Sequence, residues 1–367
     1  MNPNFLAFVE DPGAANYLAP VVAGLQARGA TCRFFAGTAA SEYLRDRGVS
    51  VEMLPADASA RALLDQVRPR VLLAGTSENP DAFGLALIDA ARSLTIPSVA
   101  AVDGAANSTH RFRGRGHEAL AHAPDWILVS DACTKESYVA LGIAADHVVV
   151  CGHPHYDVVY AARRALEAEG HSAVRARVLP VARERRVVVF VSEISGGLDA
   201  EQFRRSDAYT LQGHGSEGRT EIVLDELIDA IALGPTRPFL VLRLHPKNTP
   251  DDYPRHAPAF DELSQGGSPL DLVFAADLVV GMTSMLLLEA ALLGRPTLAI
   301  VPRRLERDWL PSIGWGVTAC VHERAALRAQ LAFMLDGPSA SGVPPTTGVA
   351  PQGSTDLVVS FLGRCLR

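Results

Sequence analysis

The sequence has no surplus of basic residues. Its 34 lysines and arginines are outnumbered by 41 aspartates and glutamates, which gives the 367-residue chain a net charge of −7. A protein that binds nucleic-acid phosphates needs a basic patch or domain, so we exclude nucleic acid as a partner. Paired cysteines are missing too. The five cysteines are dispersed and form no Cys-x-x-Cys motif, which predicts reduced thiols rather than disulfides or a zinc site.

Long apolar runs are also absent. No segment approaches the roughly 18 consecutive apolar residues of a membrane-spanning helix, so we expect no membrane span. The opening MNPNFLAFVEDPG has no basic region and reaches Glu10-Asp11 after a short apolar run, unlike a signal peptide. With 48% hydrophobic and 20% charged residues, the composition is that of a globular enzyme, which we expect to be cytoplasmic.

The chain is longer than a single hydrophobic core normally accommodates, which predicts two domains. In its first part, short β-branched segments alternate with amphipathic ones, the pattern of βα units that form a parallel sheet. The expected strands are 5–10, 30–37, 49–54, 71–77, 97–103, 125–131 and 147–152. The expected helices are 14–28, 41–47 and 82–93.

A basic, alanine-rich segment at 161–186 interrupts this alternation and is interpreted as a linker region. A second series follows, with expected strands at 187–193, 239–245, 272–281 and 296–301 and a helix at 221–233. We therefore predict an α/β fold of two Rossmann-like domains facing across a cleft, with domains at 1–160 and 187–353. The low-complexity segment 336–354 is expected to be a mobile loop, and the helical end 354–367 is expected to pack back on the first domain.

Ligands of parallel sheets bind at the carboxyl ends of the strands, so polar residues there are candidates for the site. At the end of the strand 187–193, VSEISGG places Ser192 and Glu193 shortly before Gly196 and Gly197. Glycine lets the backbone approach a ligand closely, and free amides can hold phosphate. A simple flexible turn is the alternative.

The next strand end is RLHPKN. Arg243 and His245 share one face of the strand by period-two alternation, and Pro246 ends the ladder. An imidazole beside Lys247 could hold a diphosphate or protonate a departing phosphate oxygen, although a lone histidine is more often structural.

The segment GMTSMLLLE, 281–289, begins a helix with two hydroxyls and carries an acid among leucines. Thr283 and Ser284 could cap the helix's own amides or, helped by the partial positive charge there, bind phosphate. Glu289 lies about 7.5 Å further along the axis at about 1.5 Å per residue. A buried carboxylate is costly unless it is hydrogen-bonded, and a ribose diol would be a suitable partner.

Strand ends of the first domain carry carboxylates and other polar groups. Carboxylates at such ends are candidate general bases, although each could also be a turn-former or a helix cap. The acceptor-side candidates are Glu10, Asp11, Glu78, Asp103, Asn107 and His110. The segment CGHPHYD adds His153, His155 and Asp157, but no distant third ligand is indicated, so we predict no metal site.

Three segments, VVVCGHPHYDVV, FLVLRLHPKN and GMTSMLLLEAALLGRPTLAI, resemble in this order the GT-B superfamily of nucleotide-sugar glycosyltransferases and UDP-N-acetylglucosamine 2-epimerases. The resemblance covers nearly the whole chain, through short motifs that many activities share. It implies that Thr283 and Ser284 hold the donor's phosphates and that Glu289 holds the ribose. His245-Pro246 with Ser284 is also similar to bacterial sialyl-, polysialyl-, Kdo- and glycerophosphotransferases, where these residues hold a cytidine nucleotide.

The chain departs from the epimerase pattern at three places. Where epimerases carry Thr-x-His-Arg-Arg-Glu-Asn, it has VSEISGGLD. Their Gly-Asp-Thr turn corresponds to AGTSEN, and their His-x-Glu-Ala-Gly to AAVDGAAN. The resemblance therefore favours nucleotide binding over epimerase chemistry.

These observations predict a metal-independent glycosyltransferase that moves a sugar from a UDP-, CMP- or CDP-linked donor to an acceptor hydroxyl, in polysaccharide or glycoconjugate biosynthesis. The expected partners are the nucleotide-sugar donor and a small-molecule or glycan acceptor, with no further cofactor. Asp11 or Asp103 would deprotonate the acceptor. His245, Lys247 and the amides near Gly196 and Ser284 would stabilise the departing phosphate.

Two alternatives stay open, the second of them from another class of protein. The first is a sugar-nucleotide 2-epimerase or hydrolase, in which Glu78, Asp103 or Glu193 would remove the proton at C2 of the sugar. The second is a non-catalytic binding protein that has kept the fold.

Overall fold

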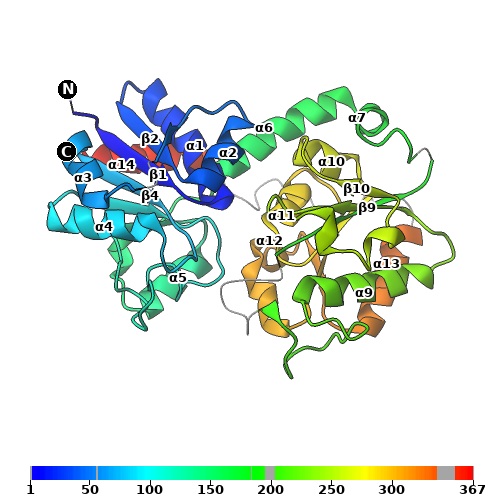
Figure 1. Ribbon diagram of the computed structural model, residues 1–367. Helices are drawn as coiled ribbons and strands as arrows, with labels where there is room; N and C mark the ends of the chain where they lie inside the picture. Colours follow the sequence, from blue (N-terminus) through cyan, green and yellow to red (C-terminus); the bar gives the residue numbers. More distant parts are fainter. Residues whose placement is uncertain (1, 55–56, 183, 195–202, 337–351, 367) are drawn as a thin grey trace. The chain divides into compact units, whose positions relative to one another are not determined.

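A computed structural model describes residues 2–54, 57–182, 184–194, 203–336 and 352–366. The chain divides into two compact units, each an α/β structure (Figure 1). Unit 1 comprises Met1–Val158 and Pro351–Arg367, and unit 2 comprises Val159–Ala350. Among the described helices, none combines the length and the apolar character needed to cross a membrane.

Unit 1 is built on a seven-stranded parallel sheet of order β3-β2-β1-β4-β5-β6-β7. Its strands are β1 (Phe5–Val9), β2 (Cys32–Ala36), β3 (Glu52–Met53), β4 (Val71–Gly75), β5 (Ser98–Ala101), β6 (Trp126–Val129) and β7 (Val148–Val150). Its helices are α1 (Pro12–Ala27), α2 (Thr38–Arg45), α3 (Ala60–Val67), α4 (Phe83–Ser93), α5 (Ala132–Ala140) and α14 (Ser354–Cys365). The boundary between the units falls within α6 (Pro154–Glu169).

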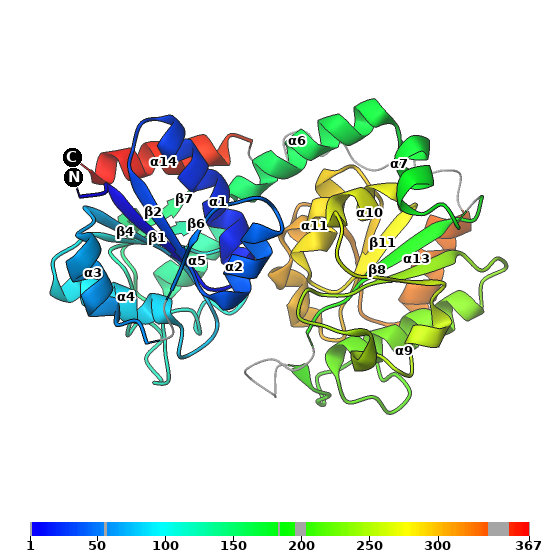
Figure 2. The same cartoon turned by 45° about the horizontal axis from the view of Figure 1, so that its top comes forward.

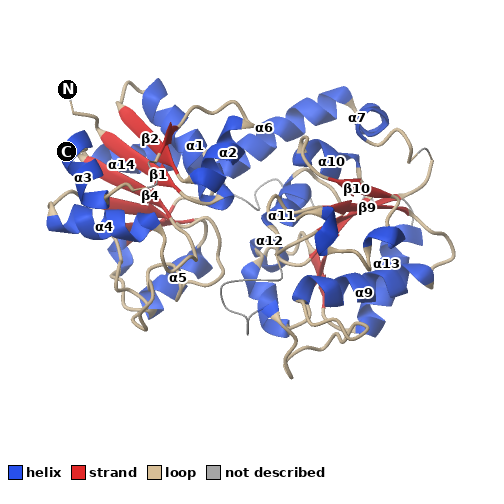
Figure 3. Ribbon diagram, viewed as in Figure 1, coloured by secondary structure: helices blue, strands red, loops and turns tan. Residues whose placement is uncertain are grey.

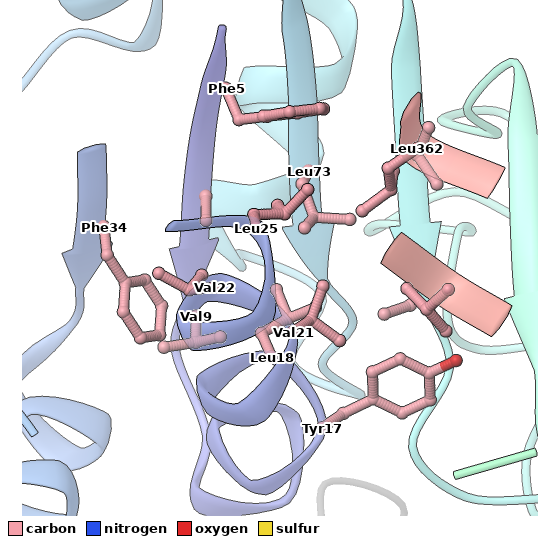
Figure 4. Packing of buried hydrophobic residues seen from close by; sticks show 14 of the residues in the cluster. Phe5, Val9, Tyr17, Leu18, Val21, Val22, Leu25, Phe34, Leu73 and Leu362 are labelled. Carbon is pink, nitrogen blue, oxygen red and sulfur yellow. The ribbon is translucent and has the colours of Figure 1, made fainter. Parts of the chain in front are cut away.

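The central strand β1 is buried on both faces, as strands of parallel sheets generally are. Because successive side chains point to opposite faces, Phe5, Ala7 and Val9 pack under α1 and α14, whereas Leu6 and Phe8 pack against α3 and α4. Figure 4 shows the first of these cores, in which Leu18, Val21 and Leu25 of α1 lie over the face of the sheet at β1 and β4. The sheet therefore carries a helical layer on each face.

The C-terminal helix α14 completes the core of unit 1. Val358 and Leu362 are buried in the same cluster as α1, and Figure 2 shows α14 and α1 on the same side of the sheet. The carboxylate of Asp157 in α6 accepts hydrogen bonds from the backbone N–H groups of Gly353 (2.7 Å) and Thr355 (2.8 Å), at the start of α14. Two unpaired amides of that helix start are thereby satisfied.

Unit 2 repeats the architecture with a six-stranded parallel sheet of order β10-β9-β8-β11-β12-β13. Its strands are β8 (Val187–Val191), β9 (Phe239–Arg243), β10 (Glu262–Ser264), β11 (Leu278–Gly281), β12 (Thr297–Ile300) and β13 (Ala319–Val321). Its helices are α7 (His171–Val178), α9 (Arg219–Ala232), α10 (Pro269–Ala275), α11 (Met285–Leu292), α12 (Pro311–Gly314) and α13 (Arg324–Asp336). Figure 3 shows α9 and α13 on one face of the sheet and α10 and α11 on the other.

The strand orders confirm the predicted α/β fold with two Rossmann-like sheets. One predicted strand, 272–281, is wrong in its first half, because Ser268 caps a helix with Pro269 at its first position and the strand begins only at Leu278. The segment 161–186, expected to be a linker, contains the end of α6 and all of α7. Most of the loop expected at 336–354 lies outside the described residues.

Candidate functional site

In a doubly wound sheet, ligands bind where the strand order reverses, at the carboxyl ends of the two central strands. This switch point lies between β1 and β4 in unit 1 and between β8 and β11 in unit 2. Glycine ends both β4 and β11. An added β-carbon would lie 2.6 Å from Ala14 Cβ at Gly75, and 2.6 Å from Val191 Cγ2 at Gly281. The two sheets thus offer equivalent places for a site, each requiring close packing at a glycine.

At the switch point of unit 2, a carboxylate bridges the strand ends. Glu193 follows β8, and its Oε1 accepts a hydrogen bond from Thr283 N (2.6 Å), just before α11. Its Oε2 accepts from Thr283 Oγ1 (2.9 Å) and from Arg219 Nη1 (2.8 Å). One side chain therefore connects the end of β8 to the starts of α9 and α11.

Arg219, the first residue of α9, is the centre of a buried ionic network. Its side chain is 1% exposed, and Nε donates to Oε2 of Glu306 (2.8 Å), which is 0% exposed. Glu306 also accepts from Arg303 Nε (2.5 Å). Burial opposes the charge of Arg219, but Glu193 and Glu306 together raise the pKa of its guanidinium above the ordinary value. The guanidinium is therefore charged, and its charge is balanced inside the protein.

His245 lies just beyond β9 in the same unit. Its backbone N–H donates to Ser192 Oγ (2.8 Å), and its Nδ1 accepts from Lys247 N (3.1 Å). Burial, together with the charge of Lys247, lowers the pKa of His245, while Glu193 opposes that shift. The ring is therefore neutral at pH 7, and since Nδ1 accepts, the proton lies on Nε2, which can donate.

Three polar residues at or near the start of α11, Thr283, Ser284 and Glu289, have different surroundings. Ser284 is the N-cap, and its Oγ accepts from Leu286 N at 3.3 Å, so the hydroxyl caps the helix as the simpler interpretation expects. Glu289, one turn and a half further along, is 6% exposed within an otherwise apolar helix. Thr283, by contrast, has both its amide and its hydroxyl directed to Glu193.

Other predicted residues of unit 2 are less central. Arg243 Nη1 donates to Ser264 Oγ (3.1 Å) and to the carbonyl of Gly266, beyond the edge strand β10 and on the side of β9 away from β8. Lys247 is exposed. Gly196 and Gly197 lie outside the described residues.

In unit 1, two acids follow β1. Asp11 is the N-cap residue of α1, and its Oδ2 accepts from Ser77 Oγ (2.5 Å), just after β4. Glu10 Oε2 accepts from the backbone N–H of Phe83 (2.9 Å), at the start of α4. Asp11 thus lies between the two central strands, whereas Glu10 caps a neighbouring helix.

Asp103, after β5, forms the second acidic centre of unit 1. Its Oδ1 accepts from Arg111 Nη1 (2.6 Å), and the same nitrogen donates to Thr76 Oγ1 (3.1 Å). Glu78 Oε1 lies 3.5 Å from Arg111 Nη2. At Gly13, in the first turn of α1, an added β-carbon would lie 2.0 Å from Asp103 Oδ2. The absence of a side chain at Gly13 lets this carboxylate approach the start of α1.

Further candidates in unit 1 have local roles. Asn107 adopts φ +62°, in the left-handed region, and its carbonyl accepts from the backbone N–H of His110 (2.9 Å). His153 is buried, and its Nδ1 accepts from His155 N (3.2 Å). Asp157 caps the start of α14. Among the described residues, no group of three or more His, Cys, Asp or Glu side chains is arranged to hold a metal ion.

Sequence reasoning missed Arg219, Arg303 and Glu306. The arginine begins a helix in GSEGRTEIV, a polar stretch typical of a solvated helix start, and its partner Glu306 is far away in the sequence. The available signal was Glu193 itself. An acid directly after a buried strand, at the switch point, needs a cation, and that need could have prompted a search for one.

No protein-family model matches the sequence, and no curated protein matches it. The structure, however, is similar to several solved structures. The S. aureus MnaA–UDP co-structure is 13% identical, with a TM-score of 0.68 over 99% of this chain and 96% of that one. UDP-GlcNAc 2-epimerase from Methanocaldococcus jannaschii is 13% identical, with a TM-score of 0.67 over 98% and 99%. Anabaena Alr3699/HepE, solved with UDP and glucose, is 14% identical, with a TM-score of 0.60 over 99% and 97%.

These likenesses extend over essentially the full length of each chain. They confirm the predicted GT-B fold, with its two Rossmann-like units. At this level of identity the likeness defines the fold, and the activity has to be argued from the side chains at the two switch points.

Proposed function

We propose that the protein is a glycosyltransferase that takes a sugar from a nucleotide-activated donor. The nucleotide, linked through UDP, CDP or CMP, would bind unit 2, and the acceptor would bind unit 1. The proposal depends chiefly on one observation: at the switch point of unit 2, Thr283 and the buried Arg219 already hold a carboxylate. A position that stabilises a carboxylate also suits a phosphate, since both are oxyanions that accept charge-assisted hydrogen bonds.

Neighbouring residues support a nucleotide at this position. Ser284 begins α11, where the helix dipole favours an anion, and Glu289 is a buried acid on the same helix that a ribose diol would suit. His245, neutral with its proton on Nε2, would donate to the departing phosphate. Lys247, which is exposed, would place a positive charge near the departing phosphate. In this proposal the chain's own residues neutralise the leaving group, without a metal ion or a further cofactor.

Unit 1 would provide the base. Asp11 and Asp103 are carboxylates at the carboxyl ends of β1 and β5, and each already accepts a hydrogen bond from a side chain of the same unit. Either could accept the proton of an acceptor hydroxyl. Arg111 would orient Asp103 through the hydrogen bond from its Nη1, and Asn107, His110, Glu10 and Glu78 would line the acceptor's surroundings.

A sugar-nucleotide 2-epimerase or hydrolase is the second candidate, because similar structures from Neisseria meningitidis and Methanocaldococcus jannaschii carry the name UDP-GlcNAc 2-epimerase. That chemistry needs a base near C2 of the sugar, for which Glu78, Asp103 or Glu193 is the candidate. The sequence, however, departs from the epimerase pattern at VSEISGGLD, AGTSEN and AAVDGAAN, and this favours the transferase.

A nucleotide screen tests the proposal. UDP, CDP and CMP should raise the melting temperature of the full chain, because a ligand that binds only the folded state stabilises it. If no nucleotide shifts the transition even at millimolar concentration, the proposal fails. Incubation of UDP-N-acetylhexosamine in deuterated water then separates the two activities. Deuterium at C2 indicates the epimerase, whereas its absence, with donor consumed only when an acceptor is supplied, favours the transferase.

A further inference from the structure

The structure contains an internal anion at the place where the proposed phosphate would bind. Both oxygens of Glu193 are engaged, Oε1 by Thr283 N at 2.6 Å and Oε2 by Thr283 Oγ1 and Arg219 Nη1 at 2.9 and 2.8 Å. These donors come from the starts of two helices and include a side chain that is 1% exposed. A phosphate oxygen would need the same donors.

The network around Glu193 divides into a fixed part and a part that can be exchanged. Glu306 is 0% exposed and holds both Arg219 and Arg303, so its withdrawal would break two buried ion pairs at once. Glu193 is 15% exposed. If its carboxylate withdrew, Arg219 would keep Glu306 as a partner, and Thr283 would offer two donors to another anion.

The backbone of Glu193 is held independently of its side chain. Its carbonyl oxygen accepts hydrogen bonds from Thr220 Oγ1 (2.8 Å) and from the hydroxyl of Tyr253 (3.1 Å). A rotation of the side chain would therefore leave the end of β8 in place. The exchange needs only rotamer changes, which occur on fast timescales.

We infer that Glu193 is a built-in competitor for the phosphate of the ligand: its carboxylate occupies the Thr283–Arg219 anion position and must withdraw before a phosphate can bind there. The inference rests on the proposed function, because it takes Thr283 as a residue that receives a ligand phosphate. It goes further in giving Glu193 an inhibitory role rather than a binding or catalytic one. It also predicts the opposite sign from a contact residue, since removing the charge of Glu193 should strengthen anion binding.

The test is a calorimetric titration of inorganic pyrophosphate, and separately of UDP, into wild type, Glu193→Gln and Glu306→Gln. Glu306→Gln is the matched control, because it removes the same charge from the same cluster without freeing Thr283. Loss of a charge-assisted competitor should lower the dissociation constant for pyrophosphate by about tenfold or more in Glu193→Gln. Glu306→Gln should show a much smaller change. Glu193→Asp, one methylene shorter but still charged, should lie between wild type and Glu193→Gln.

The outcomes separate this inference from the proposed function. Pyrophosphate affinity that is unchanged or weaker in Glu193→Gln overturns the competitor role, even if wild type binds UDP. An equal gain in Glu306→Gln also overturns it, since cluster charge alone would then explain the effect. A gain restricted to Glu193→Gln with pyrophosphate, but no binding of any nucleotide by any variant, supports the competitor and contradicts the nucleotide proposal. If Glu193→Gln does not fold, the comparison of Glu193→Asp with wild type decides the matter, and no gain there counts against the competitor.

Discussion

The switch points of the two units share a sheet topology but differ in chemistry. In unit 1, Asp103 and Glu78 contact Arg111, and their side chains remain 18% and 34% exposed. In unit 2, Arg219 is enclosed with Glu306, and both are essentially inaccessible to solvent. Topology determines where a ligand can bind, while the side chains determine which ligand charge can be accommodated. The carboxylates of unit 1 suit proton abstraction from a hydroxyl, and the donors of unit 2 suit an oxyanion.

The largest effect that we expect would separate the catalysis proposed for unit 1 from the nucleotide binding proposed for unit 2. Replacing a general base should lower kcat by about 10²–10⁴-fold, because proton transfer in the transition state is lost. We expect this of Asp103→Asn or Asp11→Asn, with nucleotide affinity unchanged. Initial rates with a working donor and acceptor pair measure it, and Asp356→Asn, which alters an exposed acid on α14, is the control. If Asp103→Asn and Asp11→Asn both retained full activity, neither aspartate of unit 1 would be the general base.

The next largest effect that we expect is on the free energy of unfolding. It tests whether the ion pairs of unit 2, which are more deeply buried, matter more for stability than those of unit 1. Arg219→Met would leave Glu306 and Glu193 without their central cation, and losing one partner of a buried ion pair costs about 3–5 kcal/mol. Arg111→Met should cost less, because Asp103 and Glu78 are partly solvated. Urea unfolding followed by tryptophan fluorescence provides the comparison. Arg177→Met, at an exposed ion pair of unit 2, should change the midpoint little, and a similar change there would undermine the argument from burial.

A pH dependence should arise from His153, next to the strand ends of unit 1. Burial, and then the charge of His155, lower its pKa to about 3, while a backbone hydrogen bond to Asp103 opposes the shift. The unfolded chain, with an ordinary histidine pKa of about 6.5, takes up the proton first as the pH falls. The stability that the neutral ring contributes is therefore complete above about pH 6.5 and is lost by up to about 1.4 kcal/mol per pH unit below it.

The variant His153→Asn lacks this titration. We expect its stability to fall less steeply than that of wild type between pH 6.5 and pH 4.5, as measured by urea unfolding at fixed pH values. The carboxylates titrate in both proteins, so the difference between the two curves isolates the histidine. Parallel curves would show that His153 is protonated as readily in the folded state as in the unfolded one.

The smallest expected effect depends on two helical glycines. Alanine normally stabilises a helix relative to glycine by about 0.8–1 kcal/mol. At Gly363, in α14, an added β-carbon meets no atom within 4 Å, so Gly363→Ala should show this gain. At Gly13 it would meet Asp103 Oδ2, so Gly13→Ala should instead destabilise by about 1–3 kcal/mol, as overpacking does. Thermal unfolding of both variants measures the difference, and a gain at Gly13 would show that Asp103 moves aside freely.

The sequence supports prediction of the repeating βα pattern and the polar strand ends, because both are local. Asp11, Asp103, His245 and Thr283 all follow strands, where the rule for parallel sheets places functional groups. The partners of these side chains could not be predicted in the same way. Arg219 contacts Glu306 across 87 positions of sequence, and Thr283 contacts Glu193 across 90, so no local pattern carries the information.

A further limit is that local patterns can favour two structures equally. The run LVFAADLVVG has the apolar character of a strand throughout, yet Ser268 and Pro269 just before it begin a helix that ends at Ala275. The N-cap signal lies outside the apolar run, so reading the run alone gave the wrong element. Likewise, Ser284 carries a cap hydrogen bond that a sequence cannot distinguish from a free phosphate-binding hydroxyl.

The central claim is that a nucleotide binds at the start of α11 in unit 2, with its ribose on Glu289. Calorimetric titration of UDP, CDP and CMP into wild type, Glu289→Ala and Asp103→Asn tests it most directly. A hydrogen bond to a charged acceptor contributes about 1.5–3 kcal/mol, so Glu289→Ala should raise the dissociation constant about tenfold to a hundredfold. Asp103→Asn, in unit 1, should leave it unchanged. Unchanged affinity in a folded Glu289→Ala variant, or a loss confined to Asp103→Asn, would contradict the account.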